Sequence, residues 1–158
     1  MEKVKEIRPP RGLARWGFRL PIWLYRLGLG GLLGGRFLLL NHTGRKSGKM
    51  RQTVLEVVRF DQETSSFIVA VGFGTSSDWY RNITANPKVI VQSGWKRWQM
   101  TASILSPQQA GTELLDYARR HPKMLEKLAS FMGYRLDGSS ESIRALGHDL
   151  KIVAFHPA

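Results

Sequence analysis

Cysteine is absent from the 158-residue sequence, which excludes disulfides, thiolate nucleophiles and thiolate metal sites. Long apolar runs are also lacking, since none approaches the roughly 20 residues that a membrane-spanning helix needs. The first ten residues are charged and lack the apolar core of a signal peptide. We therefore expect a cytoplasmic protein.

Acidic residues are scarce. Asp and Glu number 12 against 24 Lys and Arg, which gives a formal net charge of +12. Such an excess raises the local concentration of anions, so the candidate partners are nucleic acid, anionic lipid and a polyanionic small molecule. Hydrophobic residues make up 42% of the chain, and a chain of this length is predicted to form one domain, 1–158, around one core.

The usual catalytic residue sets are missing as well. The four histidines are scattered without the spacing of metal ligands, no nucleophile elbow is present, and the few acidic residues form no paired pattern. No metal site is predicted, and no catalytic residue is assigned. An enzyme with so little acid–base machinery would depend on a bound cofactor.

Hydrophobic patterning predicts an α+β fold. Strands are predicted over 37–41, 52–60, 67–71, 88–93, 97–105 and 151–155. Helices are predicted over 78–85, from the capping signal at Ser106 onward and after Pro122 as far as Gly133, with a polar loop at 137–142 and one helical turn at 143–146. About six strands, mostly joined by hairpins, should close into an antiparallel barrel covered by helices on one side.

The N-terminal segment has its own pattern. Residues 1–10 are predicted to be a loose tail, and 11–35 an amphipathic helical segment followed by a glycine-rich connector. Residues 11–27 carry arginines on one stripe and apolar residues, with Trp16 and Trp23, on another. This segment either packs on the barrel, the commoner use of such a helix, or docks on an anionic membrane surface. The second option would place the protein at the inner face of the membrane.

The turn at residues 44–51 is the richest feature. Its two glycines permit positive φ angles, and Ser47 adds a hydroxyl. Cations with exposed backbone amides suit a phosphate or a carboxylate. The alternative is that the turn is only a solvated hairpin tip, and the residue types alone favour neither interpretation. The cations of this turn are Arg45, Lys46, Lys49 and Arg51.

A second loop, residues 72–82, leaves an apolar strand, is rich in glycine and enters a helix. Its backbone amides suit an anion or a ring carbonyl. Trp79 and Tyr80 offer flat surfaces beside it, although a large aromatic residue at helical spacing is more often part of the core.

Together these residues resemble the deazaflavin (F420)-dependent nitroreductase family. The resemblance rests on Thr-Gly-Arg-Lys-Ser-Gly at 43–48, Arg51, Asp-Trp-Tyr-Arg-Asn at 78–82 and Ala-Asn-Pro-Lys-Val at 85–89. It implies a split β-barrel that binds F420, with FMN as the alternative cofactor because relatives of the same fold bind it. It also implies hydride transfer from reduced deazaflavin to a quinone-like, nitro or other small acceptor.

By the same resemblance, one set of residues would form the cofactor site. The turn would hold the phosphate and the glutamate tail, the strand after it would run along the ring, and the second loop would close the site. These residues are Arg45, Lys46, Ser47, Arg51, Gln52, Thr53, Val54, Leu55, Val71, Gly72, Phe73, Asp78, Trp79, Tyr80, Arg81 and Asn82.

The resemblance has departures. Many family members carry a lysine near the position of Phe73, and nitroimidazole-activating members use tyrosines in a C-terminal helix where this chain has Tyr134 at most. A non-enzymatic basic module remains the other class of function. Aromatic residues are not interleaved with the basic residues of the barrel, so no nucleic acid partner is expected. Split barrels often form dimers, which leaves a homodimer open.

Overall fold

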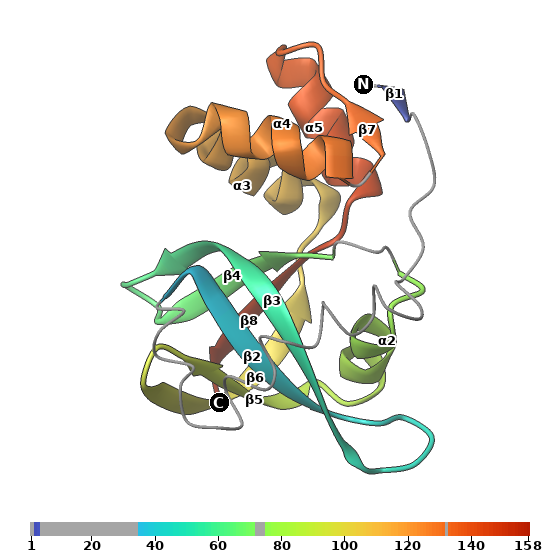
Figure 1. Cartoon of the computed structure of the whole chain (residues 1–158), viewed down its shortest axis with the longest axis vertical. Helices are drawn as coiled ribbons and strands as arrows, with labels where there is room; N and C mark the ends of the chain where they lie inside the picture. Colours follow the sequence, from blue (N-terminus) through green and yellow to red (C-terminus); the bar gives the residue numbers. More distant parts are fainter. Residues whose placement is uncertain (1, 4–34, 72–74, 132) are drawn as a thin grey trace.

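A computed structural model gives the fold of the protein and describes residues 2–3, 35–71, 75–131 and 133–158. A barrel of strands lies against a layer of helices, and one further helix sits at the end of the barrel (Figure 1). The strands are β1 (Glu2–Lys3), β2 (Phe37–Thr43), β3 (Met50–Asp61), β4 (Ser66–Ala70), β5 (Lys88–Ser93), β6 (Lys96–Ile104), β7 (Tyr134–Arg135) and β8 (Ile152–Pro157), and the helices are α2 (Asp78–Ala85), α3 (Pro107–Arg120), α4 (Pro122–Phe131) and α5 (Ser140–Asp149).

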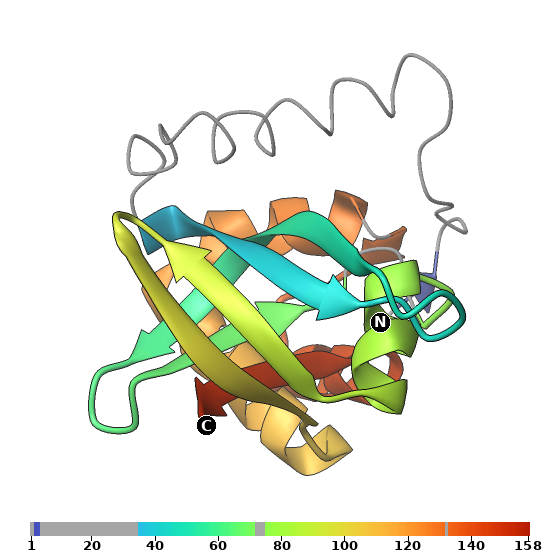
Figure 2. The same ribbon diagram turned by 90° about the horizontal axis from the view of Figure 1, so that it is seen from below.

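Six strands form a closed barrel in the order β2-β3-β4-β8-β6-β5, and every neighbouring pair is antiparallel. This confirms the predicted six-stranded antiparallel barrel. The β2–β3 turn and helix α2 lie at one end of the barrel, while the β3–β4 and β5–β6 turns lie at the other (Figure 2). The two ends therefore differ in what they can bind.

Strand β3 is the longest strand and changes neighbours along its length. Its first half pairs with β2, from Met50 opposite Thr43 to Glu56 opposite Phe37. Its pairing with β4 starts only at Val57, and the register shifts between Val57 and Arg59. Among the described strands, the first half of β3 thus has a neighbour on one side only. An edge of this kind gives a ligand access to the strand.

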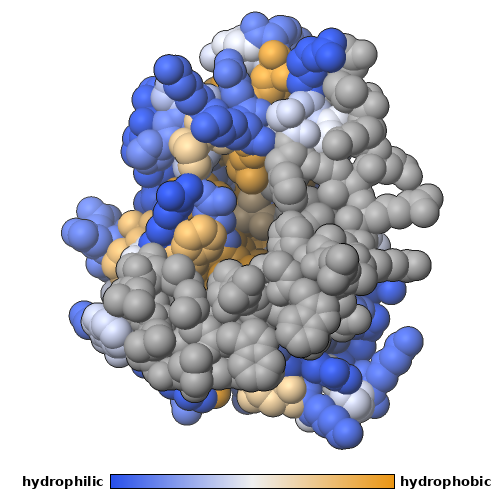
Figure 3. Space-filling view, in the orientation of Figure 1, coloured by the Kyte–Doolittle hydropathy of each residue, from blue (hydrophilic) through white to orange (hydrophobic). Residues whose placement is uncertain are grey.

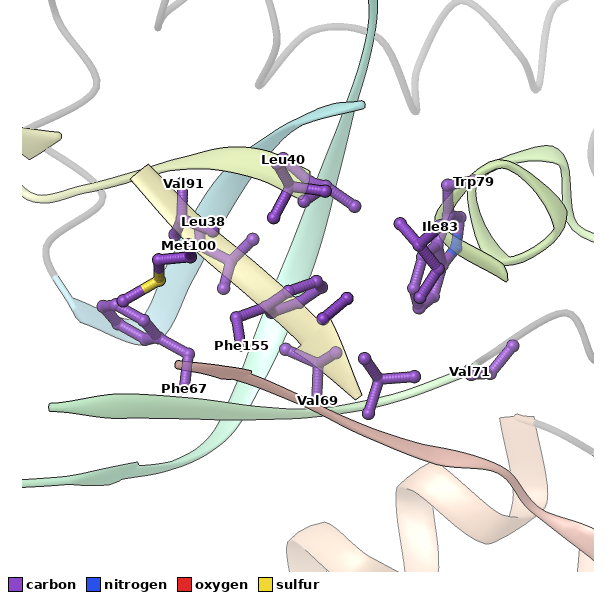
Figure 4. Close-up of a cluster of buried hydrophobic side chains, with 13 residues drawn as sticks. Leu38, Leu40, Phe67, Val69, Val71, Trp79, Ile83, Val91, Met100 and Phe155 are labelled. Carbon is purple, nitrogen blue, oxygen red and sulfur yellow. The ribbon is translucent and has the colours of Figure 1, made fainter. Parts of the chain in front are cut away.

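The barrel interior holds one hydrophobic core of buried side chains from β2, β4, β5, β6 and β8 (Figure 4), and partly buried Leu55 and Val57 of β3 pack against it. Phe155, Leu38 and Leu40 are fully buried there. Helix α2 adds Trp79 and Ile83, which point into the same core from the end of the barrel. The end that carries the β2–β3 turn is therefore closed by α2.

A second core joins the barrel to the helical layer. Strand residues Val58 and Ile68 pack with α3, α4 and α5, so the predicted cover of C-terminal helices is confirmed. On the face shown in Figure 3, apolar residues gather where this layer meets the barrel, and the outer helical surface is mostly hydrophilic. A bidentate pair from Arg59 to Glu113, with N···O distances of 2.9 and 2.8 Å, also links β3 to α3.

Local signals set the helix ends. Ser106 and Gln109 form the predicted capping box at the start of α3. The prediction was wrong after Gly133, because α5 is a ten-residue helix where a polar loop and a single turn were expected. Its N-cap is Ser139, whose side chain accepts from the backbone of Ser142 at 3.1 Å. The polar start of α5 was read as a loop because its cap lies inside a run of polar residues.

The N-terminal predictions fall mostly outside the described residues. The amphipathic segment and connector, 11–35, lie there except for Gly35. Glu2 and Lys3 pair antiparallel with Arg135 and Tyr134, so these two residues of the expected loose tail form a short strand. In the part of the chain that the structure describes, no helix is long and apolar enough to cross a membrane.

Candidate cofactor site

The basic turn joins β2 to β3 and has a defined backbone. The Gly44 N–H donates to the Lys49 carbonyl at 2.8 Å, and the Gly48 N–H donates to the Gly44 carbonyl at 2.8 Å. Gly48 has a φ of 69°, the left-handed region that favours glycine. These hydrogen bonds close the turn into a defined loop, which sets the backbone positions of its cations.

Ser47 is partly committed to the turn itself. Its Oγ accepts a hydrogen bond from the Lys49 N–H at 3.2 Å. A Cβ added at Gly44 would lie 2.7 Å from the same Oγ and 3.3 Å from the Lys49 carbonyl. The hydroxyl proton of Ser47 remains able to donate, which suits a phosphate or carboxylate oxygen.

All four cations in the turn are exposed, and three of them have no charged partner among the residues that the structure describes. Within the described residues, no ion-pair partner is present for Lys46, Lys49 or Arg51. Arg51 lies opposite His42 in the β2–β3 register, so both side chains project on the core-facing side of the sheet at the barrel mouth. A cluster of unpaired cations at one end of a barrel attracts anionic ligands.

Arg45 differs from the other three cations, because Asn82 of α2 holds it. The Arg45 N–H donates to Asn82 Oδ1 at 3.0 Å, and Arg45 Nη1 donates to the same oxygen at 2.9 Å. Asp78 lies 3.4 Å from the guanidinium but is 84% exposed, so this ion pair is weak. The Asn82 contacts therefore dominate, and they attach the basic turn to the helix.

Asn82 is in turn anchored on His42, and both residues are buried. Asn82 Nδ2 and His42 Nδ1 are 3.0 Å apart. Because Asn82 Oδ1 already accepts from Arg45, the amide nitrogen must be the donor here and His42 Nδ1 the acceptor. The neutral imidazole then carries its proton on Nε2. We name His42, Asn82 and Arg45 the Asn82 network.

The environment of His42 keeps its imidazole neutral. The pKa of His42 is lowered from 6.5 to about 4, chiefly by burial; the nearby Asp78 opposes this lowering and Arg51 adds to it. A proton on Nδ1 would face the amide nitrogen of Asn82 and break the hydrogen bond. The hydrogen bonds of the Asn82 network are therefore those that form at neutral pH.

This pKa predicts how folding stability changes with pH. Between pH 6.5 and about 4 the unfolded chain binds a proton at His42 that the folded protein does not. The stabilisation is thus full above pH 6.5 and is lost as the pH falls toward 4, by on the order of 3 kcal/mol. Urea unfolding of the wild type and of His42→Asn over this range measures it.

Asn at position 42 places an acceptor near the Nδ1 position but does not titrate. The carboxylates titrate alike in both proteins, so the difference between the two curves isolates His42. We expect the wild type to lose stability more steeply than His42→Asn on acidification. Parallel curves would show that His42 is not buried in its neutral form.

The strand residues predicted to run along the ring divide between two faces. Thr53 lies opposite Leu40 and Leu55 opposite Leu38, so both face the barrel core. Gln52 and Val54 face the other way. Gln52 Nε2 donates to Asn41 Oδ1 at 2.9 Å on that outer face. Of the four strand residues predicted to run along the ring, Thr53 and Leu55 lie on the same core-facing side as Arg51.

The start of α2 faces the same end of the barrel. Trp79 is 7% exposed and packs in the barrel core, so it has the core role that is usual for a large aromatic residue at helical spacing. Tyr80 is half-buried against the core, and Arg81 is exposed. The N-cap Ser77 makes no side-chain cap, and its buried Oγ has no hydrogen-bond partner within the described residues. A buried hydroxyl without a partner is unusual in a folded protein, and this one is able to donate to a polar group bound beside it.

Folding brings some of the predicted residues together and not others. Ser47 and the cations of the turn meet Asp78 and Asn82 at one end of the barrel, although Arg45 and Asn82 are 37 positions apart in the sequence. Val71 is fully buried in the core, and Gly72 and Phe73 lie outside the described residues. Sequence reasoning missed His42; its position two residues before the turn at 44–51 was the only signal.

The fold and site define a class: a split-barrel protein in which a basic hairpin and an adjoining helix meet at one end of the barrel. A protein-family model described as F420H(2)-dependent quinone reductase matches residues 19–135. The chain belongs to this family, which confirms the resemblance to F420-dependent split-barrel oxidoreductases.

Individual proteins with similar sequences carry the same description as the family. An F420H(2)-dependent quinone reductase of Mycobacterium tuberculosis is 34% identical over 110 residues, which cover 64% of this chain and 68% of that protein. A second, putative F420H(2)-dependent quinone reductase of the same organism is 31% identical over 108 residues, covering 67% and 83%. The solved structure of an F420-H2 dependent reductase, FDR-A, has a TM-score of 0.53 at 22% identity and covers 77% of this chain and 94% of that one. This last match supports the fold.

Proposed function

We propose that this protein is an oxidoreductase that binds reduced F420 at the basic turn and passes a hydride to a quinone. Family membership names the reaction class. The single structural observation that carries the proposal is the group of exposed, unpaired cations beside the open edge of β3. F420 is anionic through its phosphate and glutamate tail, so its charge complements this end of the barrel.

The donor set fits such a group. Lys46, Lys49 and Arg51 would neutralise the anionic tail, with Arg51 able to make bidentate contacts. The Ser47 hydroxyl would add one neutral donor. Helix α2 brings its N-terminus and the unsatisfied Ser77 Oγ to the same end of the barrel. Groups of this kind suit negative charge and ring carbonyls.

Bound F420 in its reduced form supplies the hydride, and the chain supplies binding, orientation and exclusion of water. Thr53 and Leu55 would form the floor of the site, because they face the core beside the open edge. Tyr80 and the buried Trp79 close the barrel end behind it. This apolar wall would keep water away from a cofactor ring bound there.

An F420 titration tests the proposal. We expect purified protein to change the fluorescence of F420 saturably, and to oxidise reduced F420 only when a soluble naphthoquinone is present. FMN serves as the competing ligand, because a protein built for FMN would be isolated yellow and would bind FMN in preference. Absence of saturable F420 binding would overturn the proposal, whatever the quinone used.

We further propose a nitro compound as a second acceptor, a cytoplasmic location, a homodimer and an anionic membrane surface contacted by residues 11–27. Light scattering measures the oligomeric state. Sedimentation with anionic vesicles, compared between the full chain and a chain lacking residues 1–27, measures the membrane contact.

A further inference from the structure

The Asn82 network joins three segments that are distant in sequence. Its members come from the end of β2, the basic turn and the middle of α2. Two of them, His42 and Asn82, are 3% exposed, so a ligand at the surface has little access to them. Asn82 also uses its hydrogen-bonding groups within the protein, with two bonds accepted by Oδ1 and one donated by Nδ2.

These features distinguish Asn82 from the exposed cations. Because Asn82 is 3% exposed and both its amide oxygen and its amide nitrogen are already bonded within the protein, a cofactor at the surface has little access to it. Arg45 is the opposite case, because only one of its guanidinium nitrogens is held closely and its side chain is 23% exposed. Asn82 fixes where the remaining Arg45 donors point, and His42 fixes which way the Asn82 amide is turned.

We propose that Asn82 and His42 are positioning residues that orient Arg45 toward the anionic part of the cofactor without touching the cofactor themselves. The proposal rests on the proposed function, since it names how one cation of that site is held. Pre-orientation of a flexible arginine reduces the entropy lost when the cofactor binds. It also keeps the turn and α2 together in the unliganded protein.

A double-mutant cycle on F420 affinity tests the role of Asn82. Asn82→Ala is expected to weaken F420 binding about tenfold, the effect of losing one charge-assisted hydrogen bond. In an Arg45→Ala background the same change should alter affinity by no more than about twofold, because the side chain that Asn82 orients is gone. Equal effects in both backgrounds would show that Asn82 contacts the cofactor itself, and would overturn the proposal.

His42 supplies a second test that does not need the loss of Asn82. His42→Leu removes the acceptor for the Asn82 amide and is expected to weaken F420 binding, while His42→Asn keeps an acceptor and should restore it. The groups that face His42 are Asp78 from α2 and Arg51 from β3, and both are unchanged in these variants. Equal F420 affinities for His42→Leu and His42→Asn would overturn the role of His42.

A measurement without F420 separates the two proposals. The Arg45 amide should exchange slowly with solvent deuterium in the wild type, because it donates to Asn82 Oδ1, and quickly in Asn82→Ala. Ser93→Ala is the matched control, since it removes a hydrogen bond to the Phe37 carbonyl at the other end of the barrel and should leave Arg45 exchange and F420 affinity unchanged. Wild-type protein that protects Arg45 but fails to bind F420 overturns the proposed function. Unprotected Arg45 overturns the positioning role.

Discussion

Reversing two charges in the basic turn, with Lys46→Glu and Arg51→Glu together, is expected to weaken F420 binding at least about a hundredfold at low ionic strength. Both cations are exposed and have no ion-pair partner within the described residues, so both are available to an anion. The double change replaces two attractive contacts with two repulsive ones. Fluorescence titration with F420 at several salt concentrations measures the effect, which should shrink as salt screens it.

A matched control exists in the same barrel. Lys96→Glu with Arg97→Glu changes the net charge of the protein by the same amount, but at the β5–β6 turn at the opposite end (Figure 2). Because the two turns lie at opposite ends of the barrel and salt screens distant charges more than close ones, F420 affinity should stay within about twofold of the wild type at physiological salt. Equal losses in the two double variants would mean that overall charge, rather than the turn, governs binding.

Gly147→Ala is expected to destabilise the fold by about 3 kcal/mol, through forced separation of α3 and α5. A Cβ at Gly147 would lie 2.6 Å from the backbone nitrogen of Gly111 and 2.8 Å from its Cα. Backbone atoms in a packed helix cannot move aside as a flexible side chain would. Alanine favours a helix over glycine by up to about 1 kcal/mol, so the clash decides the sign. Urea denaturation measures the change.

Gly111→Ala is the control, because it lies on the other side of the same helix contact. A Cβ there would meet Arg144 at 3.6 Å or more, an ordinary van der Waals distance. We expect Gly111→Ala to be neutral or to stabilise the protein by about 0.5–1 kcal/mol, through the lower entropy of the unfolded chain. The explanation fails if the two variants are destabilised alike.

Much of the barrel was predictable from local patterns. Strand β5 and helix α2 have the predicted bounds, 88–93 and 78–85, because hydrophobic alternation and the Asn86–Pro87 stop signal are local. The predicted end of the last strand at 155 falls two residues short of the observed Pro157. Its pairing with β6, where His156 lies opposite Thr101, extends it, and such pairing is a tertiary effect.

The roles of single glycines could not be predicted in this way. Gly111 lies within α3 and Gly147 within α5, and from helix propensity alone both are expected to destabilise their helices. Only the packing of α3 against α5 shows that one of them is a contact point with no room for a methyl group. Helix crossing geometry depends on residues far apart in the sequence.

The sequence by itself determined the family, the six-stranded barrel and the position of the basic turn, because short-range spacing and composition carry these features. Tertiary structure decided what the predicted site residues do. In the folded protein Trp79 and Val71 are buried in the core. Thr53 and Leu55 face the core, whereas Gln52 and Val54 face outward. Asn82 is hydrogen-bonded to Arg45 and His42. The physical reason is that closure of the barrel brings β2, the turn and α2 to one end, and the direction of each side chain is fixed only when those three segments meet.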